Sequence, residues 1–130
     1  MSHTLLQPAG WARPHGYANG VVAEGRQVFV SGQIGWDAEQ HIVSDDFAAQ
    51  ARQALANVVA VLACAGAVPA HLVRLTWYVT SREEYSASLA EIGVIYRELI
   101  GRHFPAMSVV VVAGLLEPRA KVEIEATAVV

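Results

Sequence analysis

KVEIEATAVV, residues 121–130, carries the clearest structural pattern in the chain, because apolar and polar side chains alternate along it. Successive side chains of a β-strand point to opposite sides of a sheet, so a period of two predicts a strand with one buried face. The buried face would hold Val122, Ile124, Ala126 and Ala128. The opposite face would hold Lys121, Glu123, Glu125 and Thr127, which places the two glutamates side by side and leaves Glu125 exposed or in an interface.

Two longer stretches before it also predict strands. Residues 71–80 alternate in the same way, with Trp77 between Leu75 and Val79 on the apolar face, so we expect Trp77 in the core. Residues 108–113, SVVVVA, are apolar and β-branched almost throughout, which is typical of a strand covered on both faces. Helices can cover only one of these faces, so the other face predicts contact with a second subunit.

The N-terminal quarter of the chain predicts a hairpin. Residues 4–20 combine prolines and glycines with aromatic side chains, which is typical of an irregular arm. Residues 21–23 and 27–31 predict two short strands, and the loop Glu24-Gly25-Arg26 between them favours a hairpin turn.

Two stretches predict amphipathic helices. Residues 46–65 repeat apolar side chains at three- and four-residue steps, Asp45-Asp46 can cap the first turn, and Gly66 suits the C-terminal cap. A second helix is expected to begin at the capping box Ser81-Arg82-Glu83-Glu84 and to end at Gly101.

The order strand, strand, helix, strand, helix, strand, strand predicts an α+β fold, a mixed β-sheet with two helices packed on one face. The length of 130 residues predicts a single domain over residues 1–130. The uncovered face of the sheet requires another subunit, and periodicity alone leaves both a dimer and a trimer open.

The composition argues against several classes of function. A net charge of -3 and the absence of a Lys/Arg run argue against nucleic-acid binding. The N-terminus lacks the pattern of a secretion signal and no long apolar run occurs, so we expect a cytoplasmic protein without a membrane partner. Cys64 is the only cysteine, which excludes an intrachain disulfide, and its place on the first helix predicts a buried thiol. The five histidines show no metal-binding spacing, so no metal is expected.

Four stretches, in this order and spacing, together resemble the reactive-intermediate deaminase (Rid/YjgF) family. They are Gly16-Tyr17 with Gly20-Val21, Val30-Ser31-Gly32-Gln33-Ile34, Phe104-Pro105-Ala106, and Val122-Glu123-Ile124-Glu125-Ala126. The resemblance extends through the first helix and covers nearly the whole chain. It implies a chorismate-mutase-like subunit, a homotrimer around a shared barrel, and three clefts between neighbouring subunits that bind a small molecule.

The resemblance also implies a chemistry. Deaminases of this family hydrolyse enamines and imines to a keto acid and ammonia without a metal or cofactor. By position, Tyr17, Ser31 and Gly32 are expected to line the cleft, and Glu123 is expected to hold the attacking water. A carboxylate in a partly dry cleft can orient a water molecule and transfer its proton.

One departure from the family changes the expected specificity. Active deaminases carry an arginine directly after Pro-Ala, and this chain carries Met107 followed by Ser108. That arginine would bind the substrate carboxylate through a bidentate pair, which a thioether cannot replace. We expect Met107 and Ser108 to line a more apolar cleft. The candidate replacements for the missing cation are Arg13, His15, His103 and Arg119.

Each of these residues also has a purely structural interpretation. Glu123 could belong to a solvated strand face, Tyr17 could pack the arm against the fold, and Met107 could fill the core. Ser31-Gly32 could mark a strand end or bulge. At the level of function, the sequence favours a hydrolase of altered specificity. The alternatives are a non-catalytic trimer that binds a metabolite and, less favoured given the charge, a ribonuclease.

Overall fold

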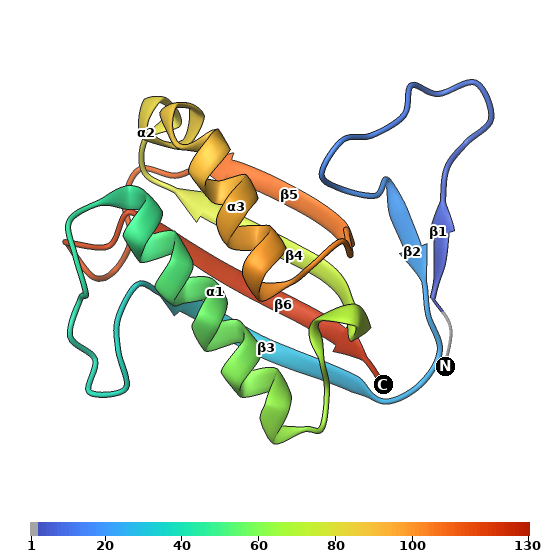
Figure 1. Ribbon diagram of the computed structural model, residues 1–130, viewed down its shortest axis with the longest axis horizontal. Helices are drawn as coiled ribbons and strands as arrows, with labels where there is room; N and C mark the ends of the chain where they lie inside the picture. The colour runs from blue at the N-terminus through green and yellow to red at the C-terminus, as the bar shows by residue number, and fades with distance from the viewer. Residues whose placement is uncertain (1–2) are drawn as a thin grey trace.

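Four strands form the main sheet of the computed structural model, which describes residues 3–130 (Figure 1). They are β3 (Gln27–Ile34), β4 (Leu72–Val79), β5 (Ala106–Val111) and β6 (Val122–Val129), in the spatial order β3-β6-β4-β5. Strand β6 runs antiparallel to both of its neighbours, whereas β5 is parallel to β4. The sheet is therefore mixed, as the sequence predicts, and β3 and β5 are its edges.

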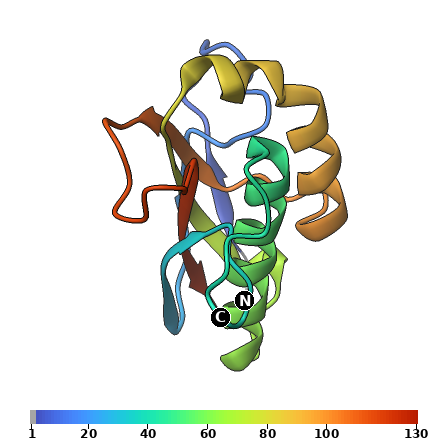
Figure 2. The same cartoon turned by 90° about the vertical axis from the view of Figure 1, so that its left-hand side faces the viewer.

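The helices lie on one side of this sheet (Figure 2). They are α1 (Phe47–Cys64), α2 (Arg82–Ala87) and α3 (Leu89–Leu99), and a short 3-10 turn, η1 (Pro69–His71), precedes β4. The second helix of the sequence prediction is divided in two at Ser88, which ends α2 and begins α3. The Ser88 N–H donates to the Tyr85 carbonyl at 3.1 Å, a three-residue step that ends α2.

The helix caps form where the sequence predicts them. The Asp46 carboxylate accepts a hydrogen bond from the Ala49 N–H at 2.9 Å, and the Ser81 hydroxyl accepts one from the Glu84 N–H at 3.1 Å. Gly66 and Gly101 have φ values of 70° and 92°, the left-handed conformation that ends a helix. These caps fix the length of α1 and α3 and thereby the place of α3 over β4 and β5.

The core lies between α1, α3 and one face of the sheet. Val122, Ile124 and Ala128 of β6 face it, as the alternating pattern predicts, and Trp77 is only 2% exposed. Helix α1 is long and apolar enough to cross a membrane by composition, with a mean hydropathy of 1.3. Eight of its residues are buried inside the protein, so its apolar character is that of a core helix.

The predicted hairpin of residues 21–31 is wrong. Strand β2 (Gly20–Val22) pairs with β1 (Thr4–Leu6), a segment that the sequence assigned to an irregular arm. Arg26 instead exchanges two backbone hydrogen bonds with Val130, at 2.9 and 2.8 Å, because the chain turns there to place β3 beside β6. The β1-β2 ribbon consequently stands apart from the main sheet (Figure 1).

The face of the sheet opposite the helices is open in the single chain. On this face Phe29 is 72% exposed and Val110 of the edge strand β5 is also exposed. Val109 and Val111 alternate with Val110 and so lie on the helix side, where they too are exposed. The strand predicted to be covered on both faces is thus covered on neither by this chain alone. The Cys64 prediction is also wrong, because the thiol is exposed near the C-terminal end of α1.

Candidate functional site

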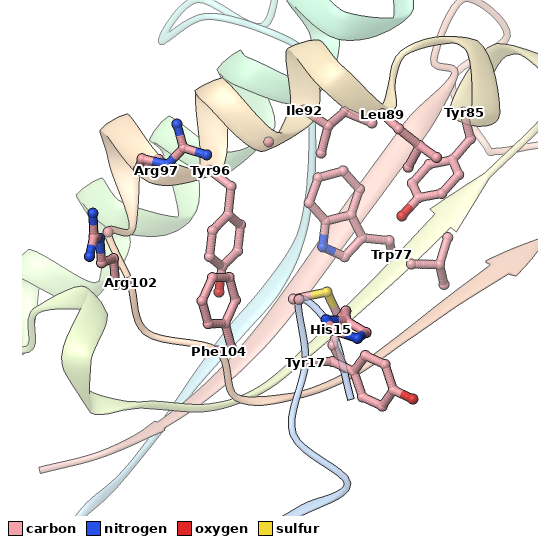
Figure 3. Close-up of a pocket in the computed structure, with 15 residues that line it drawn as sticks. His15, Tyr17, Trp77, Tyr85, Leu89, Ile92, Tyr96, Arg97, Arg102 and Phe104 are labelled. Carbon is pink, nitrogen blue, oxygen red and sulfur yellow. The ribbon is translucent and has the colours of Figure 1, made fainter. Parts of the chain in front are cut away.

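A pocket of about 450 Å³ lies on the helix side of the sheet, between α3, the strands β4 and β5, and the N-terminal arm (Figure 3). The arm forms one wall because Ala18 joins the start of β5. The Ala18 N–H donates to the Pro105 carbonyl at 3.0 Å, and Ala18 bridges to Ala106 in parallel register. Gly16 and Tyr17 therefore lie beside the first residues of β5, and Tyr17 and Met107 line the same pocket.

Aromatic side chains form most of the pocket wall. Tyr96 and Phe104 stack with ring centroids 5.4 Å apart and planes 7° from parallel, and Trp77 meets Tyr85 edge to face at 6.3 Å. The Tyr96 hydroxyl donates to the His103 carbonyl at 2.6 Å. Burial raises the pKa of Tyr96 well above its ordinary value, so this hydroxyl stays protonated and remains a donor.

Trp77 brings an uncommitted hydrogen-bond donor to this wall. Its indole Nε1–H is buried and has no acceptor among residues 3–130. In Figure 3 the indole nitrogen lies on the side of the ring that faces Tyr96 and Phe104, toward the middle of the pocket. A buried N–H without a partner costs roughly 1–3 kcal/mol, so buried donors are usually paired.

Three basic side chains line the pocket, His15, Arg97 and Arg102. Only His15 is among the replacements that the sequence suggested. Arg119 forms an ion pair with Asp45 at 2.9 Å, and the His103 ring hydrogen-bonds the Leu72 carbonyl at 2.7 Å.

Arg13 does not line the pocket either. The sequence did contain a signal for Arg97: Leu89, Gly93 and Arg97 follow at steps of four, which places all three on one helix face.

A second cluster of predicted site residues lies on the opposite, open face of the sheet. Glu123 of β6 pairs with Ile34 of β3 and Tyr78 of β4. Its carboxylate lies against Gly32, where a β-carbon would come within 2.7 Å of Glu123 Cδ. The pairing of β3 with β6 shifts register between Val30 and Gln33, so Ser31-Gly32 forms a bulge. Only a residue without a side chain leaves room for the Glu123 carboxylate there.

Tyr78 is a residue of this open face that sequence reasoning did not single out. Its hydroxyl donates a very short hydrogen bond to Glu125, which sequence analysis left as an exposed or interface residue. That hydrogen bond, with desolvation and the charges of Glu125 and Glu123, raises the pKa of Tyr78. Glu125 is therefore held by a neighbour, whereas no hydrogen bond from residues 3–130 engages the Glu123 side chain.

The predicted site residues thus form two groups in one chain. Tyr17 and Met107 lie in the helix-side pocket, and Ser31, Gly32 and Glu123 lie on the open face. Ser108 follows Met107 on β5 and pairs with Thr76, so it belongs to the open face. Within residues 3–130, no cluster of three or more His, Cys, Asp or Glu side chains is arranged to hold a metal ion.

The chain matches one protein family over most of its length, and a relative matches it over almost all of it. The family described as Endoribonuclease L-PSP matches residues 11–130. A 2-iminobutanoate/2-iminopropanoate deaminase of Salmonella typhimurium is 36% identical over 132 residues, covering 99% of this chain and 98% of the relative.

Solved structures agree with this relationship. A Rid-family protein of Yersinia pestis, YyfB, has a TM-score of 0.88 and 36% identity over 100% of both chains. The TdcF protein of Escherichia coli, solved with bound serine, has a TM-score of 0.69 and 31% identity over 98% of both chains.

Proposed function

This chain belongs to the Rid/YjgF family, and from that premise we propose that it is a hydrolase of reactive imines or enamines whose specificity differs from that of the iminobutanoate deaminases. The observation that carries the proposal is the Glu123 carboxylate seated against Gly32, free of hydrogen-bond partners among the described residues. A free carboxylate in this position is available to hold a water molecule.

The proposed reaction replaces a C=N bond by a C=O bond. Glu123 accepts a proton from the water molecule as its oxygen attacks the imine carbon, and return of that proton to nitrogen gives a tetrahedral carbinolamine. Glu123 then accepts the hydroxyl proton and passes it to the amino nitrogen, so the C–N bond breaks as the C=O bond forms and the products are a carbonyl compound and ammonia. Glu123 serves as base and then as acid, and the overall reaction consumes one water.

Met107 is the basis for altered specificity. It lines the helix-side pocket. By the resemblance to the family, it stands where active deaminases carry their carboxylate-binding arginine. A thioether supplies neither charge nor donor, whereas hydrogen bonds to a charged group contribute about 1.5–3 kcal/mol. A small imino acid held mainly by that arginine should therefore bind this protein weakly.

The two groups of site residues lie on opposite faces of the sheet, so one chain cannot bring them to a single substrate. We propose a homotrimer in which the pocket of one subunit meets the Glu123 face of its neighbour. The exposed apolar side chains of the open face, Phe29 and Val110 among them, support such an interface. The substrate would then bind in a cleft between two subunits.

The second candidate function is a non-catalytic trimer that binds a small metabolite. It is favoured by the absence of the family arginine at Met107 and by TdcF, a relative solved with bound serine. Ribonuclease activity has less support, because the net charge is -3 and only nine lysines and arginines are spread along the chain.

Ammonia release from freshly generated imines tests the proposed reaction. The panel would contain imines with and without a carboxylate, with small and with bulky side chains. We expect turnover of a subset, and we expect the Glu123→Gln variant to lose it by roughly 10²–10⁴-fold, the usual contribution of a general base.

Glu125→Gln is the matched control, because Glu125 lies two residues along the same strand face but already bonds Tyr78. It should keep most of the activity. Equal losses of activity in both variants would mean that the negative charge of the open face matters and not Glu123 itself. If no imine is turned over, the non-catalytic trimer that binds a metabolite becomes the favoured function.

A further inference from the structure

We infer that the helix-side pocket takes an aromatic carboxylate, with its ring among the aromatic side chains and its carboxylate toward Arg97 and Arg102. This inference rests on the proposed function in one respect, that the ligand carries a carbonyl or imine group. It goes beyond that function by assigning the class of substrate and the residues that select it.

The walls select a flat apolar group. Trp77 and Tyr85 meet edge to face, Tyr96 and Phe104 are stacked, and Leu89 and Ile92 of α3 close the pocket between them (Figure 3). A volume of about 450 Å³ lies within the range of small-molecule sites and exceeds what a two- or three-carbon side chain can fill. Aromatic rings contribute both area and favourable edge or offset contacts in such surroundings.

Gly93 leaves additional room on the helix side. It lines the pocket, and a β-carbon at this position would have no atom within 4 Å. Any larger residue on this face of α3 would project into the space between the helix and the strands. The glycine thus keeps the pocket wide enough for a ring.

Arg97 and Arg102 supply the charge that Met107 lacks. Both line the pocket near Tyr96 and Phe104, both are exposed, and neither has a carboxylate partner among residues 3–130. The exposed position avoids the desolvation that would oppose a buried cation. Their guanidinium groups can form bidentate hydrogen bonds with a carboxylate.

In Figure 3 Trp77 lies between Tyr85 and Leu89 on one side and Tyr96, Phe104 and the two arginines on the other, and its Nε1–H is on the arginine side. A carbonyl oxygen or imine nitrogen next to the carboxylate would reach this donor once the ring and the carboxylate are in place. The indole would then fix which way round the ligand binds, because a buried donor favours the pose that satisfies it.

Equilibrium binding, measured by isothermal titration calorimetry, tests the inference without requiring turnover. The probes are phenylpyruvate, its methyl ester and pyruvate. We expect phenylpyruvate to bind at least about tenfold more tightly than either of the others, because each of them lacks one of the two recognised groups.

Variants assign the contacts. Arg97→Gln combined with Arg102→Gln should weaken phenylpyruvate about tenfold and leave the methyl ester unchanged, whereas Arg82→Gln, an exposed arginine outside the pocket, should change neither. Trp77→Phe keeps an aromatic ring and removes the N–H donor, so it should weaken the binding of phenylpyruvate and of its methyl ester. Gly93→Phe fills the pocket and should abolish binding.

Equal affinity for pyruvate and phenylpyruvate, or phenylpyruvate binding unaffected by the arginine double variant, would overturn the inference. Because the arginines are exposed, that variant does not depend on the folding of the core. Tight phenylpyruvate binding without ammonia release from any imine would uphold the ligand class and remove only the proposed reaction.

Discussion

Among single residues, Gly32 and Glu123 fit together most closely at the proposed catalytic position. A β-carbon at position 32 would lie 2.7 Å from Glu123 Cδ, so Gly32→Ala should push the carboxylate aside without disturbing the core, since Gly32 is exposed. A displacement of about 1 Å in a catalytic group costs roughly 10²-fold in rate. Imine hydrolysis should fall by about that factor.

The control for this variant is Gly114→Ala, in the loop between β5 and β6. A β-carbon at Gly114 would meet no atom within 4 Å. Its turnover should match that of the parent protein. A Gly32→Ala variant that keeps full activity would mean that the Glu123 carboxylate has no fixed role in the reaction.

Asp37 gives a prediction for acid stability. Its carboxylate accepts hydrogen bonds from the N–H groups of His41 and Glu39, both at 3.0 Å, and the His41 N–H is the main cause of its lowered pKa. A carboxyl with a lowered folded pKa stabilises the protein above its unfolded pKa of 3.8, and this contribution is lost as pH falls through the folded pKa. We therefore expect the free energy of unfolding, measured with urea, to fall less for Asp37→Ala than for the parent protein when the pH is lowered below about 4. Parallel pH curves would contradict this.

Sequence reasoning reached some residues of the candidate site and missed others for a physical reason. Tyr17 and Met107 were singled out by resemblance, and the structure places both in one pocket. The roles of Trp77, Arg97 and Arg102 depend on how α3 is rotated over the sheet and which way an indole is turned. A strand period of two marks Trp77 as buried but does not reveal that its N–H lacks an acceptor.

Among the helices and strands, replacement by alanine should change the free energy of unfolding in opposite directions at Gly93 and Gly35. Gly93 lies inside α3 with free space around it, so Gly93→Ala should raise the free energy of unfolding by about 0.5–1 kcal/mol through helix propensity. Gly35 lies against α1, where a β-carbon would come within 2.6 Å of Gln50 Cα. Gly35→Ala should therefore lower the free energy of unfolding. Chemical denaturation measures both, and shifts of the same sign would contradict the packing described.

Local signals predicted the elements well and their partners less well. Strand β6 follows its alternating pattern, and α1 and α3 end at glycines as expected. The pairing of β2 with β1 was missed, because residues 4–6 are too few for a pattern to be recognised. The choice of partner for a short strand depends on contacts distant in sequence, here the attachment of Arg26 to Val130.

At the scale of the whole molecule, one sheet separates the two halves of the proposed site. The helices cover one face (Figure 2). The other face carries Glu123 and exposed apolar side chains such as Phe29. In a ring of identical subunits each interface joins two different surfaces, so the pocket of one subunit can meet the Glu123 face of the next. The proposed working cleft therefore belongs to two chains.

Whether two chains form one cleft can be measured from the activity of mixed oligomers. Gly93→Phe blocks the pocket and Glu123→Gln removes the base, so each variant alone should be inactive. Co-expressed at equal levels with different tags and purified through both, they should regain about a third of the parent activity, because every mixed trimer has one cleft of three in which an intact pocket meets an intact Glu123. Mixed oligomers as inactive as either variant would show that one chain must supply both halves, which contradicts the account.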